Sequence, residues 1–387
     1  MNQKTTLIYI VTVQDSLIFF RGLIHYLQLN GIEVHIISSP GELLAETAQK
    51  EKIAAFAVDM PRRIAPRQQL AAIWRLYRYI RRVKPAIVHA NFPIGGLLGV
   101  IAARLAAVPI VIYGMRGLRF DTTAGLQRRI LYLTERISCF LAHQVITNSF
   151  VVRERAIHLG ICPKEKIITL ASGSSNGVDA DERFNPQRLP PEIKRNVRAE
   201  YDIPAEALVV GFVGRIVADK GIEELEQAWQ ILAPGWPSLY LVLVGNWESH
   251  NPVPLPVMAR LTEDQRVKLV GKVSDPAPFY AAMDILVLPT RREGFPNTPL
   301  EAAAMQLPVV ATNVDGCVEA VADGVTGLLV PPRDGAALAA AISTLLADPQ
   351  LRQDMGRRGR ERVLQDFQPR RIWQALLDNY QTLLRSR

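Results

Sequence analysis

Two glutamates, Glu293 and Glu301, are separated by seven residues in the segment E-G-F-P-N-T-P-L-E. The apolar run 285–289 comes shortly before this segment and predicts a buried strand. A helical pattern begins within the segment, where Asn297 suits the N-cap and Pro299 suits the first turn. Because the free amides and the positive end of a helix attract anions, the segment could receive a phosphate or the hydroxyl groups of a sugar.

The elements that must position this segment are short apolar runs that alternate with longer amphipathic stretches. In the first half of the chain we predict strands at residues 7–13, 34–38, 87–90, 110–113, 144–148 and 167–170. In the second half we predict strands at residues 208–214, 239–245, 267–271, 285–289, 309–312 and 328–330. A polar stretch, 171–191, separates the two series and is interpreted as an interdomain connection. Such alternation indicates parallel α/β sheets, in which ligands bind at the carboxyl ends of the strands.

Length and composition indicate a globular protein with two domains. The 387 residues exceed one ordinary domain, and 49% hydrophobic with 21% charged residues is typical of a soluble protein. We expect a cytoplasmic location, because residues 7–13 lack the features of a signal peptide and Arg104 and Pro109 interrupt the apolar region 94–114. The three cysteines lie far apart in the sequence and suggest no disulfide framework. The net charge of +8 favours an anionic partner, but no nucleic-acid-binding module is recognisable, so we expect no nucleic acid.

The E-G-F-x-x-x-x-L-E pattern resembles the signature of the family 4 glycosyltransferases. That family has the GT-B fold, with two doubly wound, Rossmann-like α/β domains facing a central cleft. The resemblance implies that Glu293 contacts the donor sugar and that Glu301 binds the ribose hydroxyls of the donor. Arg215, followed by Lys220 and Gly221, is similar to the family's G-R-x-x-x-x-K-G stretch, which implies that both cations lie on the donor diphosphate. The catalytic candidates are therefore Glu293, Arg215 and Lys220.

Further donor-binding residues are implied by the same resemblance. Within the glutamate segment they are Gly294, Phe295, Asn297 and Thr298, beside Glu301. The run 269–273 resembles the loop that seats the nucleotide base, and it adds Lys272 and Val273. The segments 113–120 and 172–179 look like a bacterial branch of the family that builds capsule, O-antigen or lipid-linked glycans.

The first half of the chain departs from the family pattern at two places. The glycine pair that many members carry after the first strand is absent, and Met115 and Arg116 stand where many members have a histidine. The candidates for contact with the acceptor or the cleft are Asp15, His89 and Arg116. We predict an acceptor-binding domain over residues 1–175, a nucleotide-sugar-binding domain over 176–368, and a C-terminal helix, 369–387, that packs back on the first domain.

The expected function is retaining transfer of a hexosyl or N-acetylhexosaminyl group from a nucleotide diphosphate sugar, most simply a UDP-sugar. The expected acceptor is a glycan or a polyprenyl-pyrophosphate-linked sugar in cell-surface polysaccharide biosynthesis. We expect no cofactor and no metal, because 179–181 matches the D-x-D motif only in a loop, while Arg215 and Lys220 supply positive charge. Two alternatives stay open: a sugar-nucleotide epimerase of the same fold, and a non-catalytic sugar-nucleotide-binding subunit. Acceptor-dependent turnover of the donor distinguishes the three.

A basic amphipathic stretch, 66–84, allows two interpretations. In the first, it is a helix that packs on the sheet through Leu70, Ile73, Trp74, Tyr77 and Ile80 and has a solvated basic face. In the second, the basic face meets anionic lipid head groups and holds the protein peripherally on the inner face of the plasma membrane. The arginines concerned are Arg75, Arg78 and Arg82, with Arg62, Arg63, Arg67 and Arg81 nearby.

Overall fold

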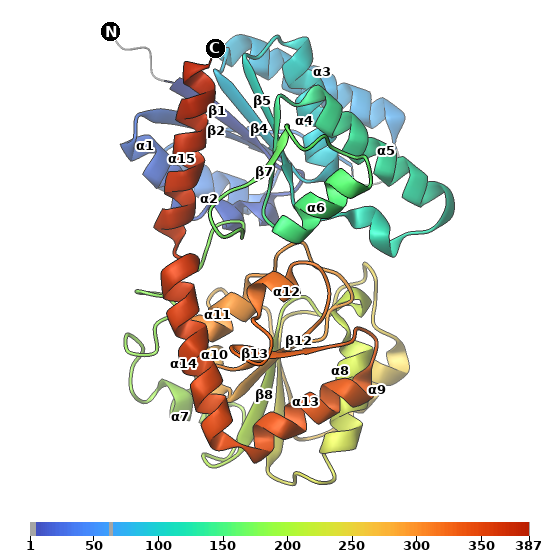
Figure 1. Ribbon diagram of the computed structural model, residues 1–387, viewed down its shortest axis with the longest axis vertical. Helices are drawn as coiled ribbons and strands as arrows, with labels where there is room; N and C mark the ends of the chain where they lie inside the picture. Colours follow the sequence, from blue (N-terminus) through green and yellow to red (C-terminus); the bar gives the residue numbers. More distant parts are fainter. Residues whose placement is uncertain (1–4, 62–64, 387) are drawn as a thin grey trace. The chain divides into compact units, whose positions relative to one another are not determined.

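The computed structural model describes residues 5–61 and 65–386, so Arg62 and Arg63 of the basic stretch lie outside the described residues. The chain forms two compact units (Figure 1). Unit 1 comprises residues 1–176 and 369–387, and unit 2 comprises residues 177–368. The division made from the sequence places the boundary one residue earlier, after residue 175. None of the helices in the described ranges combines the length and the apolar composition that crossing a bilayer requires.

Unit 1 is built on a parallel sheet of seven strands in the order β3-β2-β1-β4-β5-β6-β7. The strands are β1 (Thr5–Ile10), β2 (Ile32–Ser38), β3 (Ala54–Ala57), β4 (Ile87–Asn91), β5 (Ile110–Met115), β6 (Gln144–Thr147) and β7 (Ile167–Thr169). The strand order reverses between β1 and β4, where Tyr9 lies opposite His89 in the register. Such a reversal opens a crevice at the carboxyl ends of the two strands, which is where doubly wound sheets bind ligands.

Helices cover both faces of this sheet (Figure 1). On one face, α1 (Leu23–Leu29), α2 (Glu42–Glu51) and α15 (Pro369–Arg385) enclose one apolar core. On the other face, α3 (Pro66–Val83), α4 (Pro93–Leu105) and α5 (Gly125–Leu141) enclose a second core. The remaining helical segments of this unit are η1 (Gln14–Phe20), η2 (Arg119–Thr122) and α6 (Phe150–His158). Because both faces are buried, the central strands are mostly apolar, and the polar exceptions His89 and Asn91 lie toward the carboxyl end of β4.

Helix α15 packs on the unit 1 sheet through Ile372, Leu376, Leu377 and Tyr380, which recur at helical spacing and are buried. Polar contacts fix its orientation. The Tyr380 hydroxyl is 2.7 Å from the Tyr9 hydroxyl on β1, and the Asn379 amide donates to Gln144 at 2.7 Å. The helix thereby brings residues near the end of the chain against β1 and β6.

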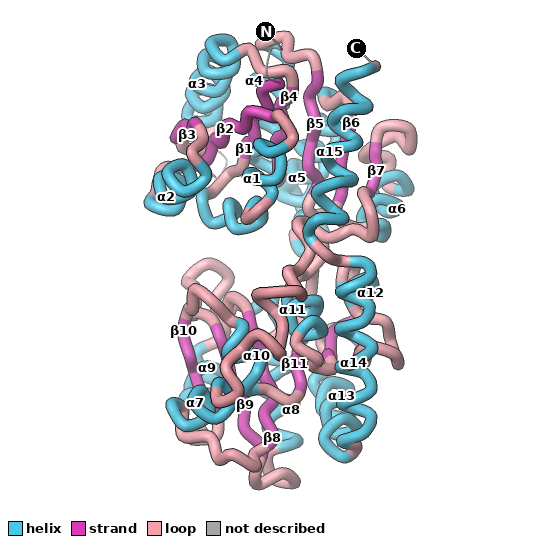
Figure 2. Tube along the Cα trace, turned by 90° about the vertical axis from the view of Figure 1, so that its left-hand side faces the viewer, coloured by secondary structure: helices cyan, strands magenta, loops and turns pink. Residues whose placement is uncertain are grey.

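Unit 2 is a parallel sheet of six strands in the order β10-β9-β8-β11-β12-β13, flanked by helices (Figure 2). The strands are β8 (Leu208–Val213), β9 (Leu239–Val244), β10 (Val267–Gly271), β11 (Ile285–Leu288), β12 (Val309–Thr312) and β13 (Gly327–Val330). The helical segments are α7 (Ile193–Glu200), η3 (Ala218–Lys220), α8 (Ile222–Leu232), α9 (Leu255–Glu263), α10 (Ala277–Ala282), α11 (Thr298–Ala304), α12 (Cys317–Ala320), α13 (Gly335–Ala347) and α14 (Pro349–Asp366). One continuous apolar core joins the sheet to these helices.

The polar stretch 171–191 contains the passage from unit 1 to unit 2, between residues 176 and 177, as the sequence indicated, but its second part is packed into unit 2. Val178, Ala180 and Phe184 are buried in the core of unit 2. The Arg360 guanidinium on α14 donates to the carbonyl oxygens of Ala180 and Phe184 at 3.1 and 3.2 Å. The turns between these residues account for the polar composition, while widely spaced side chains supply the burial.

The buried face of α3 also differs from expectation. In α3 the residues that face the core are Ala72, Leu76, Tyr79 and Ile80. Leu70 and Trp74, which the periodicity assigned to the core face, are 66% and 59% exposed. The apolar band of α3 is therefore wider than the surface that the sheet covers.

Candidate functional site

An ion pair between Lys220 and Glu293 lies at the carboxyl edge of the unit 2 sheet. Lys220 ends η3, in the connection after β8, and Glu293 lies in the loop after β11. These two strands are neighbours in the sheet, which is why their loops meet although 73 residues separate the two side chains. The side chains are only 19% and 14% exposed, so the pair is shielded from bulk water while it still reaches the surface.

Close backbone approaches fix the loops that carry the pair. Gly221 has a φ of +70°, and a Cβ at this position would collide with the carbonyl oxygen of Pro289. Gly316 has a φ of +47°, and a Cβ there would collide with the carbonyl oxygen of Gly294. Both positions require glycine because of the left-handed backbone and the missing space. The loop that holds Glu293 is therefore held between backbone segments on two sides.

Arginine ion pairs tie the same loop to the start of α8. Arg291 pairs with Glu223 at 3.1 Å and with Glu224 at 2.8 Å. The Thr290 hydroxyl donates to the carbonyl oxygen of Asp219 at 3.1 Å. These contacts hold the residues just before Glu293 and so restrict where its carboxylate can lie. These ion pairs were not predicted from the sequence, although the acidic pair Glu223-Glu224 and the Arg-Arg-Glu run 291–293 are visible there.

Glu301 lies in the first turn of α11 and is oriented by a buried tyrosine. The Tyr280 hydroxyl donates to the Glu301 carboxylate at 2.9 Å. Burial and, next, the nearby Glu301 charge raise the pKa of Tyr280 well above its ordinary value, so the phenol stays a neutral donor. The Thr298 hydroxyl donates to the carbonyl oxygen of Val213 at 3.4 Å, which joins the start of α11 to the end of β8. Nothing in the spacing of Tyr280 indicated this role.

Asn297 and Phe295, which lie between the two glutamates, mainly hold the loop and the start of α11 in place. Asn297 holds the N-cap position of α11, but its side chain makes no capping hydrogen bond, which corrects the expectation that it caps the helix. Its carbonyl oxygen accepts from the Glu301 backbone amide at 2.8 Å. Phe295 is buried, with its ring centroid 5.7 Å from that of Phe367. The Phe295 side chain therefore anchors the loop to the core, which leaves its backbone rather than its ring to meet a ligand.

The other predicted donor contacts lie on separate loops of the same sheet edge. Arg215 follows β8, is 58% exposed and pairs with Glu248 at 3.2 Å. Lys272 follows β10, and its backbone amide donates to the Asn246 side chain at 2.7 Å. Val273 packs partly against the core. The structure thus brings Lys220 and Glu293 into contact and places Arg215 and Lys272 after β8 and β10, the two strands on either side of β9.

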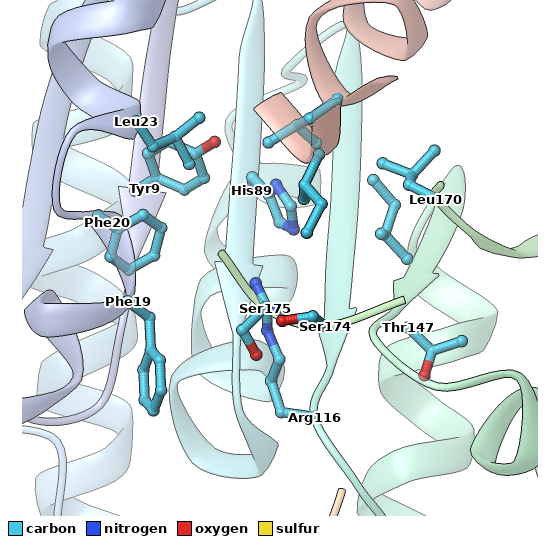
Figure 3. Close-up of a pocket in the computed structure, with 13 residues that line it drawn as sticks. Tyr9, Phe19, Phe20, Leu23, His89, Arg116, Thr147, Leu170, Ser174 and Ser175 are labelled. Atoms are coloured by element: carbon cyan, nitrogen blue, oxygen red, sulfur yellow. The ribbon is translucent and has the colours of Figure 1, made fainter. Parts of the chain in front are cut away.

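Two of the three acceptor candidates line a cavity of about 30 Å³ in unit 1 (Figure 3). His89, at the end of β4, is 2% exposed, and its Nδ1 is 2.7 Å from the Tyr380 hydroxyl. Burial and, next, the nearby Arg116 charge lower the pKa of His89 to about 3, so the imidazole is neutral. Arg116, after β5, donates to Asn91 at 3.1 Å. Asp15 is exposed in η1 and does not line this cavity.

Two family models match the chain. "Glycosyl transferase 4-like domain" matches residues 18–173, and "Glycosyl transferases group 1" matches residues 207–348. The chain is 36% identical over 386 residues to the capsular polysaccharide biosynthesis glycosyltransferase CapM of Staphylococcus aureus, covering 99% of this chain and 98% of CapM. It is 26% identical over 306 residues to the UDP-Gal:alpha-D-GlcNAc-diphosphoundecaprenol alpha-1,3-galactosyltransferase of Escherichia coli, covering 78% and 77% of the two chains.

Among solved structures, the Anabaena protein HepE in complex with UDP-glucose has the same fold. Its TM-score is 0.81 at 20% sequence identity, with 97% of this chain and 99% of that chain covered. This similarity and the two parallel sheets confirm the predicted GT-B fold with two Rossmann-like domains. The similarity to CapM along the whole chain and the two domain matches confirm the resemblance drawn from the motifs: the chain belongs to the family 4 glycosyltransferases.

Proposed function

We propose that this glycosyltransferase moves a sugar from a UDP-sugar to a glycan carried on polyprenyl pyrophosphate, with retention of anomeric configuration. The observation that carries the proposal is the shielded ion pair between Lys220 and Glu293 at the carboxyl edge of the unit 2 sheet. The relative CapM is named for capsular polysaccharide biosynthesis. The Escherichia coli relative is named for a UDP-Gal donor and a diphosphoundecaprenol-linked acceptor. By analogy, we assign this chain to capsular or related cell-surface polysaccharide biosynthesis.

The donor diphosphate is assigned to Lys220 and Arg215. An ammonium and a guanidinium can neutralise the negative charge that develops on a departing diphosphate. Lys220 is well suited to this role because it is already held in one position by Glu293. Arg215 is more exposed and pairs with Glu248 at the surface, so its guanidinium can exchange that partner for a phosphate.

The donor sugar and ribose are assigned to the two glutamates. Glu293 accepts hydrogen bonds from the sugar hydroxyls, and Glu301 accepts hydrogen bonds from the ribose hydroxyls. The Tyr280 hydroxyl supports the second assignment, because it occupies one carboxylate oxygen of Glu301 and so orients the other. Backbone groups of Gly294, Asn297 and Thr298 complete the donor contacts in this proposal, and the loop of Lys272 and Val273 receives the base.

In the transfer step, the bond between the anomeric carbon and the diphosphate oxygen breaks, and the acceptor oxygen bonds to that carbon. The acceptor proton passes to an oxygen of the leaving diphosphate. Glu293 is a poor general base for this step because Lys220 already compensates its charge. A leaving group that takes the proton on the face from which it departs is consistent with retention.

No divalent metal takes part in this proposal. Charge compensation for the leaving diphosphate comes from the Lys220 ammonium and the Arg215 guanidinium. The proposed transfer is therefore independent of added metal. It should continue in the presence of a chelator such as EDTA.

We also propose peripheral attachment to an anionic membrane through unit 1. Helix α3 presents exposed Leu70 and Trp74 beside the exposed Arg67, Arg78 and Arg81. Helix α5 adds a stripe of exposed apolar residues, Leu126, Leu133, Ile137 and Phe140, flanked by the exposed Arg128, Arg129 and Arg136. Apolar and basic side chains together on one layer of helices are suited to the boundary between lipid head groups and acyl chains.

The test is incubation of the purified full-length chain with UDP-sugars and a polyprenyl-pyrophosphate-linked sugar, with and without EDTA. We expect UDP release that depends on the acceptor, a product whose mass has grown by one sugar, and no effect of EDTA. Isomerised donor without acceptor would instead identify an epimerase, and binding without turnover would identify a non-catalytic subunit. NMR of the product linkage decides retention, since a β-product from an α-linked donor would refute it.

A further inference from the structure

The unit 1 cavity is lined by seven apolar and six polar residues. Its polar lining comprises Tyr9, His89, Arg116, Thr147, Ser174 and Ser175, and none of its thirteen lining residues is Asp or Glu. Figure 3 shows the Arg116 side chain extending towards His89, with Ser174 and Ser175 beside it. A cavity with this lining favours a ligand that is negatively charged and accepts hydrogen bonds.

Arg116 is the cation of this cavity and has an amide rather than a carboxylate as its partner. Its guanidinium donates to the Asn91 side chain at 3.1 Å, and no carboxylate in residues 5–61 and 65–386 lies within ion-pair distance of it. Burial lowers the pKa of Arg116, which means that its surroundings disfavour the charge. An anion placed beside the guanidinium would remove this penalty, because buried charges are normally paired.

His89 adds an unpartnered polar atom. Its Nε2 is buried and has no hydrogen-bond partner among the described residues, while its Nδ1 is bonded to the Tyr380 hydroxyl. The Tyr380 hydroxyl is in turn bonded to the Tyr9 hydroxyl at 2.7 Å. Buried polar atoms are almost always satisfied, so Nε2 points to a ligand or a bound water in the cavity.

Tyr9, Tyr380 and His89 together carry three protons, one more than their two mutual hydrogen bonds require. Burial raises the pKa of Tyr9 and of Tyr380 and lowers the pKa of His89, so each group is neutral and carries one proton. Two protons form the two hydrogen bonds, and the third is free. Where the donors all run in one direction, the free proton lies on His89 Nε2 or on the Tyr9 hydroxyl. Both of these residues line the cavity. An oxyanion there favours the arrangement in which Nε2 donates.

The size of the cavity narrows the class of ligand. A volume of about 30 Å³ holds roughly one or two water-sized groups, which is room for one or two oxygens of a phosphoryl group and too little for a sugar ring. Ser175 supplies a further donor, because its hydroxyl oxygen already accepts from the Asn148 amide at 3.0 Å and its own proton remains for a ligand. The cavity is therefore suited to the head of an oxyanion.

We infer that this cavity is an oxyanion subsite that receives a phosphoryl group of the lipid-linked diphosphate acceptor, with Arg116 as its cation. The identity of the ligand rests on the proposed function, in which the acceptor carries a diphosphate. The donor also carries a diphosphate, but Lys220 and Arg215 of unit 2 are assigned to that group. Arg116, Ser175 and His89 would thus select an acceptor by its diphosphate rather than by its sugar.

The experiment is calorimetric titration of the full-length chain with geranyl diphosphate, inorganic pyrophosphate and UDP. Arg116→Gln should weaken binding of geranyl diphosphate and of pyrophosphate about tenfold to a hundredfold, because a hydrogen bond to a charged group is lost. Binding of UDP should stay within about twofold. The exposed Arg128→Gln on α5 removes the same charge from the same unit and serves as the matched control.

The outcomes show whether the cavity binds the diphosphate of the acceptor, the diphosphate of the donor, or neither. An equal loss of UDP affinity would overturn the assignment to the acceptor and give the cavity to the donor. Unchanged affinity for all three probes would overturn the subsite itself. If Arg116→Gln fails to fold, as judged by circular dichroism, Ser175→Ala takes its place. Its affinity for geranyl diphosphate and for pyrophosphate should then fall by about threefold to tenfold, while its affinity for UDP stays unchanged. A wild-type chain that binds pyrophosphate through Arg116 but transfers no sugar would refute the proposed function and keep the subsite.

Discussion

Replacing Lys220 by alanine is the most direct test of the donor site. The ammonium of Lys220 is the partner of Glu293, and both side chains are largely shielded from water. An electrostatic contact in such a place is worth more in the transition state than it would be in bulk solvent. Loss of one group that stabilises a developing negative charge lowers kcat by about 10²–10³, which corresponds to about 3–4 kcal/mol. We expect a loss of this size from Lys220→Ala.

Lys220 could lower the barrier in two ways, by direct contact with the diphosphate or only by holding Glu293 in place. UDP affinity separates them, because UDP carries the diphosphate but not the sugar that is transferred and that Glu293 is assigned to hold. If Lys220 contacts the diphosphate, Lys220→Ala weakens UDP binding about tenfold or more, and it still weakens UDP binding in a Glu293→Ala background, although the size can differ because the two residues are in contact. If Lys220 only positions Glu293, UDP affinity stays near the wild-type value in both backgrounds. Glu293→Ala by itself should abolish transfer and leave UDP binding nearly unchanged.

The assay combines initial rates of acceptor-dependent UDP release with calorimetric titration of UDP. Lys194→Ala is the matched control, since Lys194 is also a lysine of unit 2 in an ion pair, 3.1 Å from Asp284, and lies outside the proposed site. It should retain kcat within about twofold, as expected for a surface pair. A loss below about threefold for Lys220→Ala contradicts a direct phosphate role. Near-normal transfer by Glu293→Ala refutes the role assigned to that glutamate.

Two further predictions concern unit 1. Burial raises the pKa of Glu135 to about 7, so the folded chain binds this proton more tightly than the unfolded chain, and stability on the order of 3 kcal/mol is lost as the pH rises from about 4.5 through 7. Glu135→Gln, which keeps an acceptor for the Tyr113 hydroxyl, should raise the melting temperature at pH 8 relative to the wild type and flatten its pH dependence; parallel pH profiles would contradict this. Replacing Arg78 and Arg81 on α3 by glutamine should weaken binding to vesicles that contain phosphatidylserine by about 2 kcal/mol, or roughly 30-fold, whereas the same change at Arg357 and Arg358 on α14 should have little effect. Equal loss in both pairs would reject the α3 surface.

Much of the fold could be predicted because central parallel strands are buried on both faces and therefore form continuous apolar runs. Strand β3 (Ala54–Ala57) was missed for the same physical reason. It is a short edge strand made mostly of alanine, and it is partly exposed, so it carries neither a long apolar run nor an alternating pattern. The helical period of α3 was also visible, but periodicity does not report how much of an apolar face the neighbouring elements cover. Only the structure shows that Leu70 and Trp74 remain exposed.

The candidate site was accessible from the sequence only where a local motif carried it. Glu293 and Glu301 lie within one turn-and-helix segment, so their spacing is itself a signal. The contact between Lys220 and Glu293 depends on the adjacency of β8 and β11, which no local pattern encodes. Tyr280 is harder still, because a buried tyrosine on a short helix looks like an ordinary core residue until its hydroxyl is found on Glu301.

The unit 1 cavity shows why departures from a family pattern can be informative. The sequence places Met115 and Arg116 where many relatives have a histidine, and it places His89 at a strand end with no further signal. Strand order reverses between β1 and β4, which leaves the carboxyl end of β4 open, and β5 continues the sheet beside it. His89 and Arg116 therefore face one cavity, with a neutral imidazole and a guanidinium that has no carboxylate partner in the part of the chain that the structure describes. If Arg116 only took over the hydrogen bonds of a histidine, a positive charge would not be needed at this position. The arginine therefore argues for a negatively charged ligand.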